Sequence, residues 1–461
     1  MSQALPNINQ KHTVKVNEGS GVLIQPMSAD YAYVLTAKHC LKVNPGDLTS
    51  AFIKAHRVYF FEGTEIPVID VICHDTKDMA ILIIASKAEH KLMVNFDLLQ
   101  VNDQLMLCGF PEDRRETDNE YSAFQYRFSY QSGDRLILSS EVPGVVHSSV
   151  VGFSGGGLFT LGLQGRPILL CAIETKMDGD VGKEYHGNIS AIPISEFEQL
   201  IGDPSKSYLN KPLAPLLPLH LSNFEHLCKF SFEVSRGWAN DDGLTLVQGC
   251  LRNTATQGIK VNLYPHELLV KFEKILKVHC RPKSESRSRG LWVSLLELLT
   301  VSILVDKPEV VDIEYVESML GSRRLMYIGK SGVWREYLSD ILQSGLETLN
   351  QDGIIVVKTL GKFHEPLSDK VFLNKVWKRK NIGRPISDPT KITNANRSLS
   401  KIHCIIDLAA LHNTCIEANE DVYEELINIE EFDEKKEAQI LTTLAKEYGA
   451  YLIIEDSIDD I

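Results

Sequence analysis

Residues 151–159 read Val-Gly-Phe-Ser-Gly-Gly-Gly-Leu-Phe, and this run says more about the fold than any other segment of the 461-residue chain. It sets Ser154 among glycines and then enters apolar residues that predict a strand. Glycines suit a tight turn that must present a hydroxyl and aim backbone N–H groups into one space. A glycine-rich run alone can also be an ordinary loop, so its interpretation depends on the segments that precede it.

Two upstream segments supply the partners that a reactive serine needs. Residues 33–40 read YVLTAKHC and end a predicted strand at His39, and residues 74–82 read HDTKDMAIL and place Asp78 just before another strand. Serine acyl transfer requires a hydroxyl, an imidazole that takes its proton, a carboxylate that orients the imidazole, and amide donors for the oxyanion. Taken singly, His39 could be a packed strand residue and Asp78 a turn residue. In this order with Ser154 they predict a catalytic triad.

Together the three segments resemble the trypsin/chymotrypsin family of serine proteases. That family has L-T-A-A-H-C at its catalytic histidine, D-[IL]-A-[IL]-L at its aspartate and G-x-S-G-G at its nucleophile, and this chain differs by Lys38 before the histidine. The resemblance implies His39, Asp78 and Ser154 as the triad, and the amides of Gly152 and Ser154 as the oxyanion hole. It covers residues 12–202 and implies neither a metal nor a cofactor.

The first 200 or so residues predict β-structure, because short apolar runs recur between Gly, Pro, Asn and Asp residues that favour turns. The resemblance implies two packed β-barrels joined near residues 95–105, with the histidine and aspartate from the first barrel and the serine from the second. We therefore expect an all-β double barrel, chymotrypsin-like, over residues 1–202.

Two departures from the family concern disulfides and activation. Cys40 is the first of nine cysteines, so it has no upstream partner for the bridge that secreted relatives form there. Phe153 stands where trypsin-type activation needs an aspartate, and the family's I-V-G-G start is absent. We expect reduced thiols, in keeping with a cytoplasmic protein, and activation that does not use an inserted N-terminus.

The resemblance also implies a substrate pocket. Ser148 would lie at its floor with Gly187 nearby, and Glu174, Thr175 and Lys176 would line one wall. A serine at the floor gives no reason to expect a trypsin-like preference for lysine or arginine. Lys176 would favour an acidic substrate residue and Glu174 a basic one, unless both side chains point to solvent. These alternatives stay open at the level of sequence.

The composition changes after the predicted barrels. Residues 203–220 contain four prolines and predict a linker. Residues 221–461 predict a mostly helical α+β domain. The expected helices lie at residues 266–279, 290–305, 332–350, 399–415 and 423–448, and the expected strands at 353–359 and 451–455.

Charge and targeting signals limit the partners. The chain has 61 acidic and 48 basic residues and a formal net charge of −13, which gives no general attraction to nucleic acid or anionic membranes. The basic stretch around Trp377 could contact nucleic acid, although a solvated loop is favoured. The N-terminus has no secretory pattern and residues 290–305 are too short to span a bilayer. We expect a cytoplasmic protein without a membrane partner.

Two functions compete. The first is a serine endopeptidase that cleaves protein substrates and is restrained or recruited through its C-terminal domain. The second is a catalytically silent relative that uses the protease fold to bind peptides. The architecture is similar to bacterial conflict-system effectors of the three-component ABC-ATPase type, which implies a role in antiviral defence and a regulatory partner, an ATPase or a sensor. This last expectation rests on architecture and not on particular residues.

Overall fold

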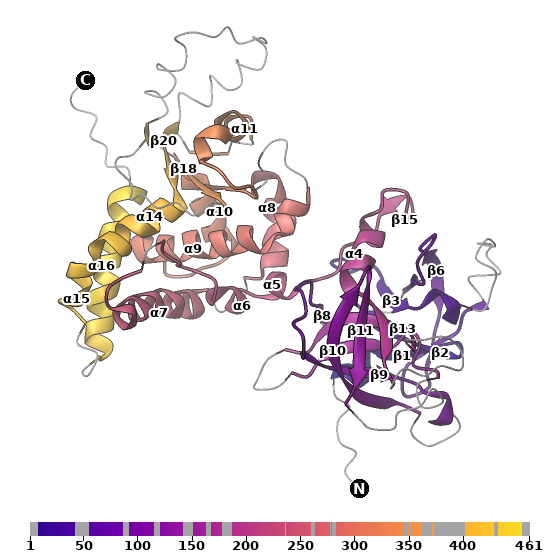
Figure 1. Cartoon of the computed structure of the whole chain (residues 1–461). Coiled ribbons are helices and arrows are strands. Elements are labelled where there is room, and N and C mark those ends of the chain that lie inside the picture. The colour runs from indigo at the N-terminus through magenta and orange to yellow at the C-terminus, as the bar shows by residue number, and fades with distance from the viewer. Residues whose placement is uncertain are drawn as a thin grey trace. The chain divides into compact units, whose positions relative to one another are not determined.

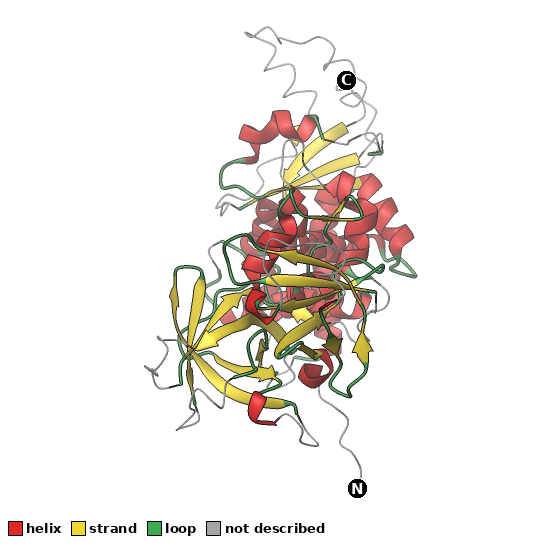
Figure 2. Cartoon of the chain, turned by 90° about the vertical axis from the view of Figure 1, so that its right-hand side faces the viewer, coloured by secondary structure: helices red, strands yellow, loops and turns green. Residues whose placement is uncertain are grey.

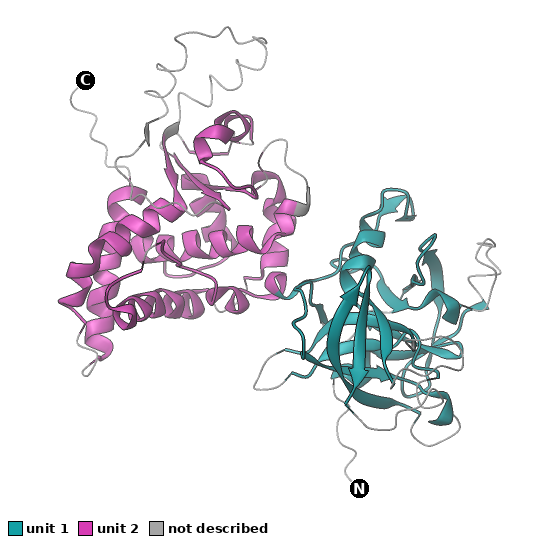
Figure 3. Cartoon of the chain, viewed as in Figure 1, with its two compact units in different colours: residues 1–219 teal, residues 220–461 magenta. Residues whose placement is uncertain are grey.

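The computed structural model describes most of the chain in two units. The described residues are 8–41, 55–85, 92–114, 120–141, 151–162, 167–177, 187–235, 237–259, 263–276, 278, 283–344, 346, 348–350, 353–360, 371–372, 402–427 and 432–453. The chain divides into compact units Met1–Leu219 and His220–Ile461 (Figure 3). Strands make up most of the first unit and helices most of the second (Figure 2).

The first sheet contains seven antiparallel strands over the described residues, in the order β5-β4-β1-β2-β3-β7-β6. Apolar residues that alternate along these strands fill its interior, among them Val14, Val34 and Leu82. The short connections between β2 and β3 and between β6 and β7 are antiparallel hairpins, as expected from the turn residues between them. The strands are β1 (Thr13–Val16), β2 (Gly19–Ile24), β3 (Ala32–Thr36), β4 (Val58–Tyr59), β5 (Glu65–Ile66), β6 (Val68–Cys73) and β7 (Ala80–Ile84).

The second sheet closes into a barrel. Its order is β12-β9-β10-β11-β14-β13-β8, and an additional pairing joins β12 to β13, so six of its strands form a ring. Closure leaves those six strands without a free edge. The strands are β8 (Met93–Val94), β9 (Gln104–Gly109), β10 (Ser122–Ser132), β11 (Arg135–Ser140), β12 (Gly157–Thr160), β13 (Leu169–Met177) and β14 (Ile189–Pro193).

A shared apolar core holds the two sheets together. It contains Val22 and Ile81 from the first sheet, Phe159 and Ile173 from the second, and Phe197 from α4 (Ile194–Gly202). The expected all-β double-barrel fold of the first part of the chain is therefore confirmed. The chain crosses between the sheets after β7 and before β8, which is earlier than the join expected near residues 95–105.

The proline-rich segment differs from the expected linker. Residues 203–219 belong to the first unit and form the hairpin β15 (Ser207–Tyr208) and β16 (Lys211–Pro212). Leu213 and Leu216 are buried in the shared core, and the carbonyl of Pro215 accepts a hydrogen bond of 2.8 Å from Met27 N. Prolines keep this segment extended, and the leucines between them bury it against the barrels.

The second unit combines helices with a small sheet (Figure 1). Its described strands run β17-β18-β20-β19, in which the first three are parallel and β19 is antiparallel to β20. The strands are β17 (Arg323–Ile328), β18 (Gly353–Thr359), β19 (Val371–Phe372) and β20 (Ile402–Asp407). The helices are α5 (Leu219–Ser222), α6 (Glu225–Cys228), α7 (Asp241–Gly258), α8 (Pro265–Leu276), α9 (Arg289–Asp306), α10 (Ile313–Ser322), α11 (Leu338–Leu342), α14 (Leu408–Cys415), α15 (Glu420–Glu424) and α16 (Glu434–Leu452).

The expected elements of the second unit are partly confirmed. The strand expected at residues 353–359 is β18, and the helices expected near 266–279 and 290–305 are α8 and α9. The helix expected at 399–415 is wrong in its first half, which is β20, and the strand expected from residue 451 is wrong because α16 continues to Leu452. A continuous apolar run fits a buried strand and a buried helix equally well.

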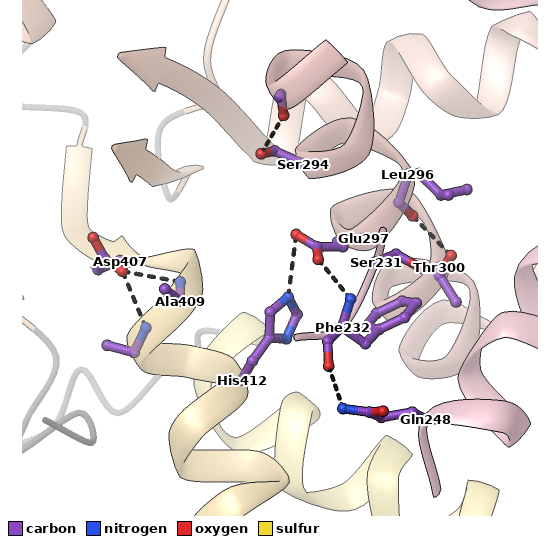
Figure 4. Close-up of polar contacts among 12 residues, drawn as sticks. Ser231, Phe232, Gln248, Ser294, Leu296, Glu297, Thr300, Asp407, Ala409 and His412 are labelled. Carbon is purple, nitrogen blue, oxygen red and sulfur yellow. Dashed lines mark hydrogen bonds and ion pairs between the residues drawn. The ribbon is translucent and has the colours of Figure 1, made fainter. Parts of the chain in front are cut away.

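A buried polar network explains the acidic residue inside the apolar helix α9. Glu297 accepts a hydrogen bond of 2.7 Å from the Phe232 N–H, and its other oxygen lies 3.5 Å from His412 Nε2 on α14 (Figure 4). His412 Nδ1 is 2.7 Å from the hydroxyl of Tyr448 on α16. Burial raises the pKa of Glu297, but His412 brings it below its ordinary value. The network therefore joins three helices through a compensated charge.

None of the helices in the described part of the chain is long and apolar enough to cross a bilayer.

Candidate active site

His39 and Asp78 lie side by side because their strands are neighbours. His39 belongs to the short helix η1 (Lys38–Cys40) after β3, Asp78 lies two residues before β7, and these strands pair with Thr36 opposite Ala80. The Asp78 Oδ2 atom is 2.8 Å from His39 Nδ1, and Oδ1 accepts a hydrogen bond of 3.0 Å from the His39 backbone N–H. One carboxylate oxygen therefore holds the imidazole, and the other holds the backbone of the same residue.

The two residues shift each other's proton affinity. The hydrogen bond to Asp78 raises the pKa of His39, with a further contribution from Cys40. Burial raises the pKa of Asp78, but the hydrogen bond and charge of His39 leave it below its ordinary value. The pair thus favours an imidazolium next to a carboxylate, which is the charge distribution that develops when a histidine takes a proton from a serine.

The turn that carries Ser154 requires its glycines. Gly152 and Gly155 adopt φ values of +94° and +86°, a region that glycine enters without strain. A Cβ atom on Gly155 would lie 2.0 Å from the carbonyl oxygen of Ser20 and 2.3 Å from Oγ1 of Thr36. A Cβ atom on Gly152 would lie 2.6 Å from the carbonyl oxygen of Phe110. The sequence Gly-Phe-Ser-Gly therefore follows from the close approach of the turn to both sheets.

Ser20 on β2 ties the serine turn to the first sheet. Its N–H donates a hydrogen bond of 2.8 Å to the carbonyl of Ser154, and its hydroxyl donates one of 2.8 Å to the carbonyl of Gly152. The Cys40 thiol also donates to the Ser154 carbonyl, at 3.1 Å. Since Cys40 follows His39, these contacts bring the three expected triad residues to one place in the fold.

Two backbone donors at the turn are free to bind a ligand. Within the described residues, the N–H groups of Gly152 and Ser154 donate no hydrogen bond. The neighbouring N–H groups are occupied, since Gly155 N donates to the Glu174 carbonyl at 2.8 Å and Gly156 N to the Phe153 carbonyl at 2.6 Å. The two groups expected to form the oxyanion hole are therefore without a partner among the described residues, and so is the N–H of Phe153 between them. No group of three or more His, Cys, Asp or Glu residues that could hold a metal occurs in the described part of the chain.

The residues expected to line the substrate pocket have different environments. Ser148 lies outside the described residues. Glu174 and Thr175 are buried, Lys176 is exposed, and Gly187 is buried with a φ of +72°. The alternative in which both Glu174 and Lys176 point to solvent is therefore wrong for Glu174.

Sequence reasoning missed the contacts of Ser20 and the burial of Glu174. The role of Ser20 was hidden, although it lies in the Gly-Ser-Gly run that opens β2, because its partners are 132 and 90 positions away in the sequence. Glu174 was expected on a pocket wall or in solvent, but its side chain is buried. Burial raises its pKa to about 8, against the opposing effects of His39 and Ser154.

The first unit has a trypsin-like protease fold. Its two sheets meet at a histidine–aspartate pair and at a serine that lies in a glycine-rich turn. Residues 191–417 match the model of C-terminal domain 4 of the ABC-three component (ABC-3C) systems. Over these residues the chain is therefore similar to a C-terminal domain of these systems. The match begins in β14 and includes the proline-rich segment.

Among the solved structures similar to this chain are the Rv3671c protease and a kallikrein-related peptidase. The inactive form of Rv3671c from M. tuberculosis H37Rv is 16% identical, with a TM-score of 0.31, over 43% of this chain and 94% of that one. Kallikrein-related peptidase 10 in complex with Zn²⁺ is 14% identical, with a TM-score of 0.32, over 43% of this chain and 97% of that one. No curated protein sequence matches the chain.

Proposed function

We propose that this chain is a serine endopeptidase that acts through an acyl-enzyme. The observation that carries the proposal is the two-point contact of Asp78 with His39 beside a serine turn that is tied to the same sheet. Such a pair is needed to deprotonate a serine, whereas a site that only binds peptides has no use for it.

The expected reaction uses groups of this chain alone. Ser154 Oγ attacks the substrate carbonyl while its proton passes to His39 Nε2, and the N–H groups of Gly152 and Ser154 bind the oxyanion. His39 then gives that proton to the departing amine as the C–N bond breaks. Water hydrolyses the resulting ester with His39 again as the base. The pocket residues Thr175, Lys176 and Gly187 would contact the substrate side chain next to the cleaved bond.

Activation differs from that of trypsin in this proposal. Phe153 is buried in the core of the second barrel, with its ring centroid 5.4 Å from that of Phe124. It thus fills with an apolar ring the place where an aspartate would receive a new N-terminal amine. This packing supports activation by a route other than cleavage near the N-terminus.

The C-terminal domain supports the proposal of a regulated effector. A domain of the ABC-3C systems implies association with other components of such a system, and we propose that an ATPase or sensor component restrains or recruits the protease. The eight described cysteines are free thiols, which fits work in the reducing cytoplasm during antiviral defence. A catalytically silent, peptide-binding module is the alternative.

Labelling with a fluorophosphonate probe tests the proposal. The Ser154 hydroxyl should attack phosphorus with loss of fluoride, so the full chain should be labelled and Ser154→Ala should not. Labelling should also fall by about 10³-fold or more in His39→Ala, because triad members act as a unit. The control is Ser139→Ala, which should label normally. The Ser139 hydroxyl, on β11, lies 3.0 Å from the hydroxyl of Ser129 on β10. Absence of labelling with and without ABC-3C partner components would contradict the proposal and favour the binding module.

A further inference from the structure

The residue that follows the expected base is joined to the expected nucleophile. Cys40, at the end of η1, is buried, and its thiol donates a hydrogen bond of 3.1 Å to the carbonyl of Ser154. Because Cys40 is adjacent to His39 in the chain, one residue connects the segment of the base to the nucleophile. A contact at this place acts on where the two reacting groups lie relative to each other.

Asn17, in the turn between β1 and β2, fixes Cys40 from the first sheet. Its side-chain Nδ2 donates a hydrogen bond of 2.8 Å to the Cys40 carbonyl. Its Oδ1 accepts one of 3.0 Å from Arg57 N, and its own N–H donates one of 2.9 Å to the Arg57 carbonyl. The φ of Asn17 is +51°, a region that asparagine enters more readily than most residues do. The main chain of Cys40 is therefore held by a side chain that is itself held at two points.

Gly19, which opens β2, closes the space around the thiol. A Cβ atom on Gly19 would lie 2.6 Å from Cys40 Sγ and 2.9 Å from the carbonyl oxygen of Ser154. Any other residue at position 19 would therefore push the thiol or the carbonyl aside. Cys40 is a free thiol, so its sulfur carries the proton that it donates to Ser154. The sulfur thus lies in a close-fitting place between β2 and the serine turn.

The carbonyl of Ser154 accepts from two donors of the first sheet's side. The Ser20 N–H donates at 2.8 Å and the Cys40 thiol at 3.1 Å. Of these two donors, only Cys40 belongs to the segment that carries His39. The side chain of His39 is 50% exposed, so packing holds it on one side alone. Its position relative to Ser154 therefore depends on the few contacts that its own segment makes.

We propose that Cys40 is a positioning residue, whose thiol fixes Ser154 relative to His39 by binding the Ser154 carbonyl. This inference rests on the proposed protease function. A general base must lie within hydrogen-bond reach of the hydroxyl that it deprotonates, and small displacements of either group slow the reaction. Loss of the thiol should therefore slow the attack by Ser154 without weakening the binding of a substrate or probe.

The test measures fluorophosphonate labelling of the full chain at several probe concentrations, in wild type, Cys40→Ala and Cys40→Ser. The maximal rate constant reports on the attack by Ser154, and the half-saturating concentration reports on probe binding. Cys40→Ala should lower the maximal rate constant about 3- to 10-fold, as expected for one lost hydrogen bond between neutral groups, and leave the half-saturating concentration unchanged. Cys40→Ser keeps a donor, so its maximal rate constant should lie within about 2-fold of the wild-type value.

Cys73→Ala is the matched control. Cys73, on β6, is also a free thiol and packs against the core of the first sheet, so its variant should keep the wild-type rate constant. A merely structural role of Cys40 would lower the labelled fraction of the protein but not the rate constant of the fraction that remains folded. That result, or a Cys40→Ser variant as slow as Cys40→Ala, would overturn the role of Cys40 while leaving the protease function standing. If neither wild type nor any variant is labelled, the protease function itself fails, and the inference fails with it.

Discussion

At the scale of single residues, Asp78 would determine the pH at which His39 can act as the base of the proposed reaction. A general base must be neutral before it takes a proton. The hydrogen bond to Asp78 raises the pKa of His39 above its ordinary value of 6.5. The imidazole therefore stays protonated to a higher pH than a free histidine would, and labelling of Ser154 should be lost as pH falls through that raised pKa.

The variant Asp78→Asn tests this coupling. An amide carries no charge and cannot favour the imidazolium, so the midpoint of the acid limb should move to lower pH. The maximal labelling rate should fall about 10³- to 10⁴-fold, because the imidazole loses its orientation and its partner charge. Asp75→Asn is the control, since the Asp75 side chain is 82% exposed and bonds to Lys206. An acid limb that does not move in Asp78→Asn would contradict the assigned role.

How far sequence predicts this site depends on which contacts are local. His39, Asp78 and Ser154 stand in short segments whose order and composition are informative without a structure. The burial of Glu174 depends on the pairing of β13 with β14 and on an irregularity in the pairing between Glu174 and Lys176. A shift of one residue in register would turn the side chain to the other face. No local pattern fixes that register.

At the scale of elements, the contact between β2 and the serine turn holds the two sheets in the geometry that the proposed reaction needs. The Ser20 hydroxyl donates to the Gly152 carbonyl and accepts from Phe110 N at 2.9 Å. It therefore connects β2, the end of β9 and the turn. Catalytic groups that come from different elements work only when those elements are held within fractions of an ångström.

Removing this connection should affect stability and reactivity together. Ser20→Ala leaves the buried Phe110 N–H without a partner, which should cost about 1–3 kcal/mol of unfolding free energy. Labelling of Ser154 should slow because Gly152 also loses its anchor. Denaturant unfolding and labelling rates measure the two effects, with Ser139→Ala as the control. Unchanged labelling in a destabilised Ser20→Ala protein would show that the anchor serves folding alone.

Strands of the second unit show where pattern reading fails at this scale. The runs that form β18 and β20 are both short and apolar, and each strand pairs with a neighbour on either side, parallel in every case except β19. The residues of β18 are buried almost without interruption. Such strands carry no alternation. Only β18, bounded on its N-terminal side by Asn-Gln-Asp-Gly, could be told from a helix in advance. The helix α14 follows β20 directly, and Asp407 caps it through Ala409 N and Ala410 N.

At the scale of the whole molecule, the proline-rich segment belongs to the protease-like unit and not to a free connection. Leu216 is wholly buried, and its N–H donates a hydrogen bond of 3.0 Å to Glu198 Oε2 on α4. The Tyr33 hydroxyl donates to the Ala214 carbonyl at 2.9 Å. The last residues of the first unit are thus part of the core that holds both barrels. A change in this segment should therefore destabilise the barrels and reduce the labelling of Ser154.

Leu216→Ala tests this connection in the full chain. Truncating a buried leucine to alanine typically costs about 2–5 kcal/mol, through lost burial and the cavity left behind. The matched control is Leu209→Ala on the same segment, because Leu209 is 73% exposed and its truncation should cost less than about 0.5 kcal/mol. The readout is Ser154 labelling after a heat step, which reports on the first unit alone. Leu216→Ala should lose labelling at a lower temperature than wild type, and Leu209→Ala should not. If all three proteins lost labelling at the same temperature, the segment would only connect the units. A segment that stabilises the barrels cannot be weakened without lowering their melting temperature.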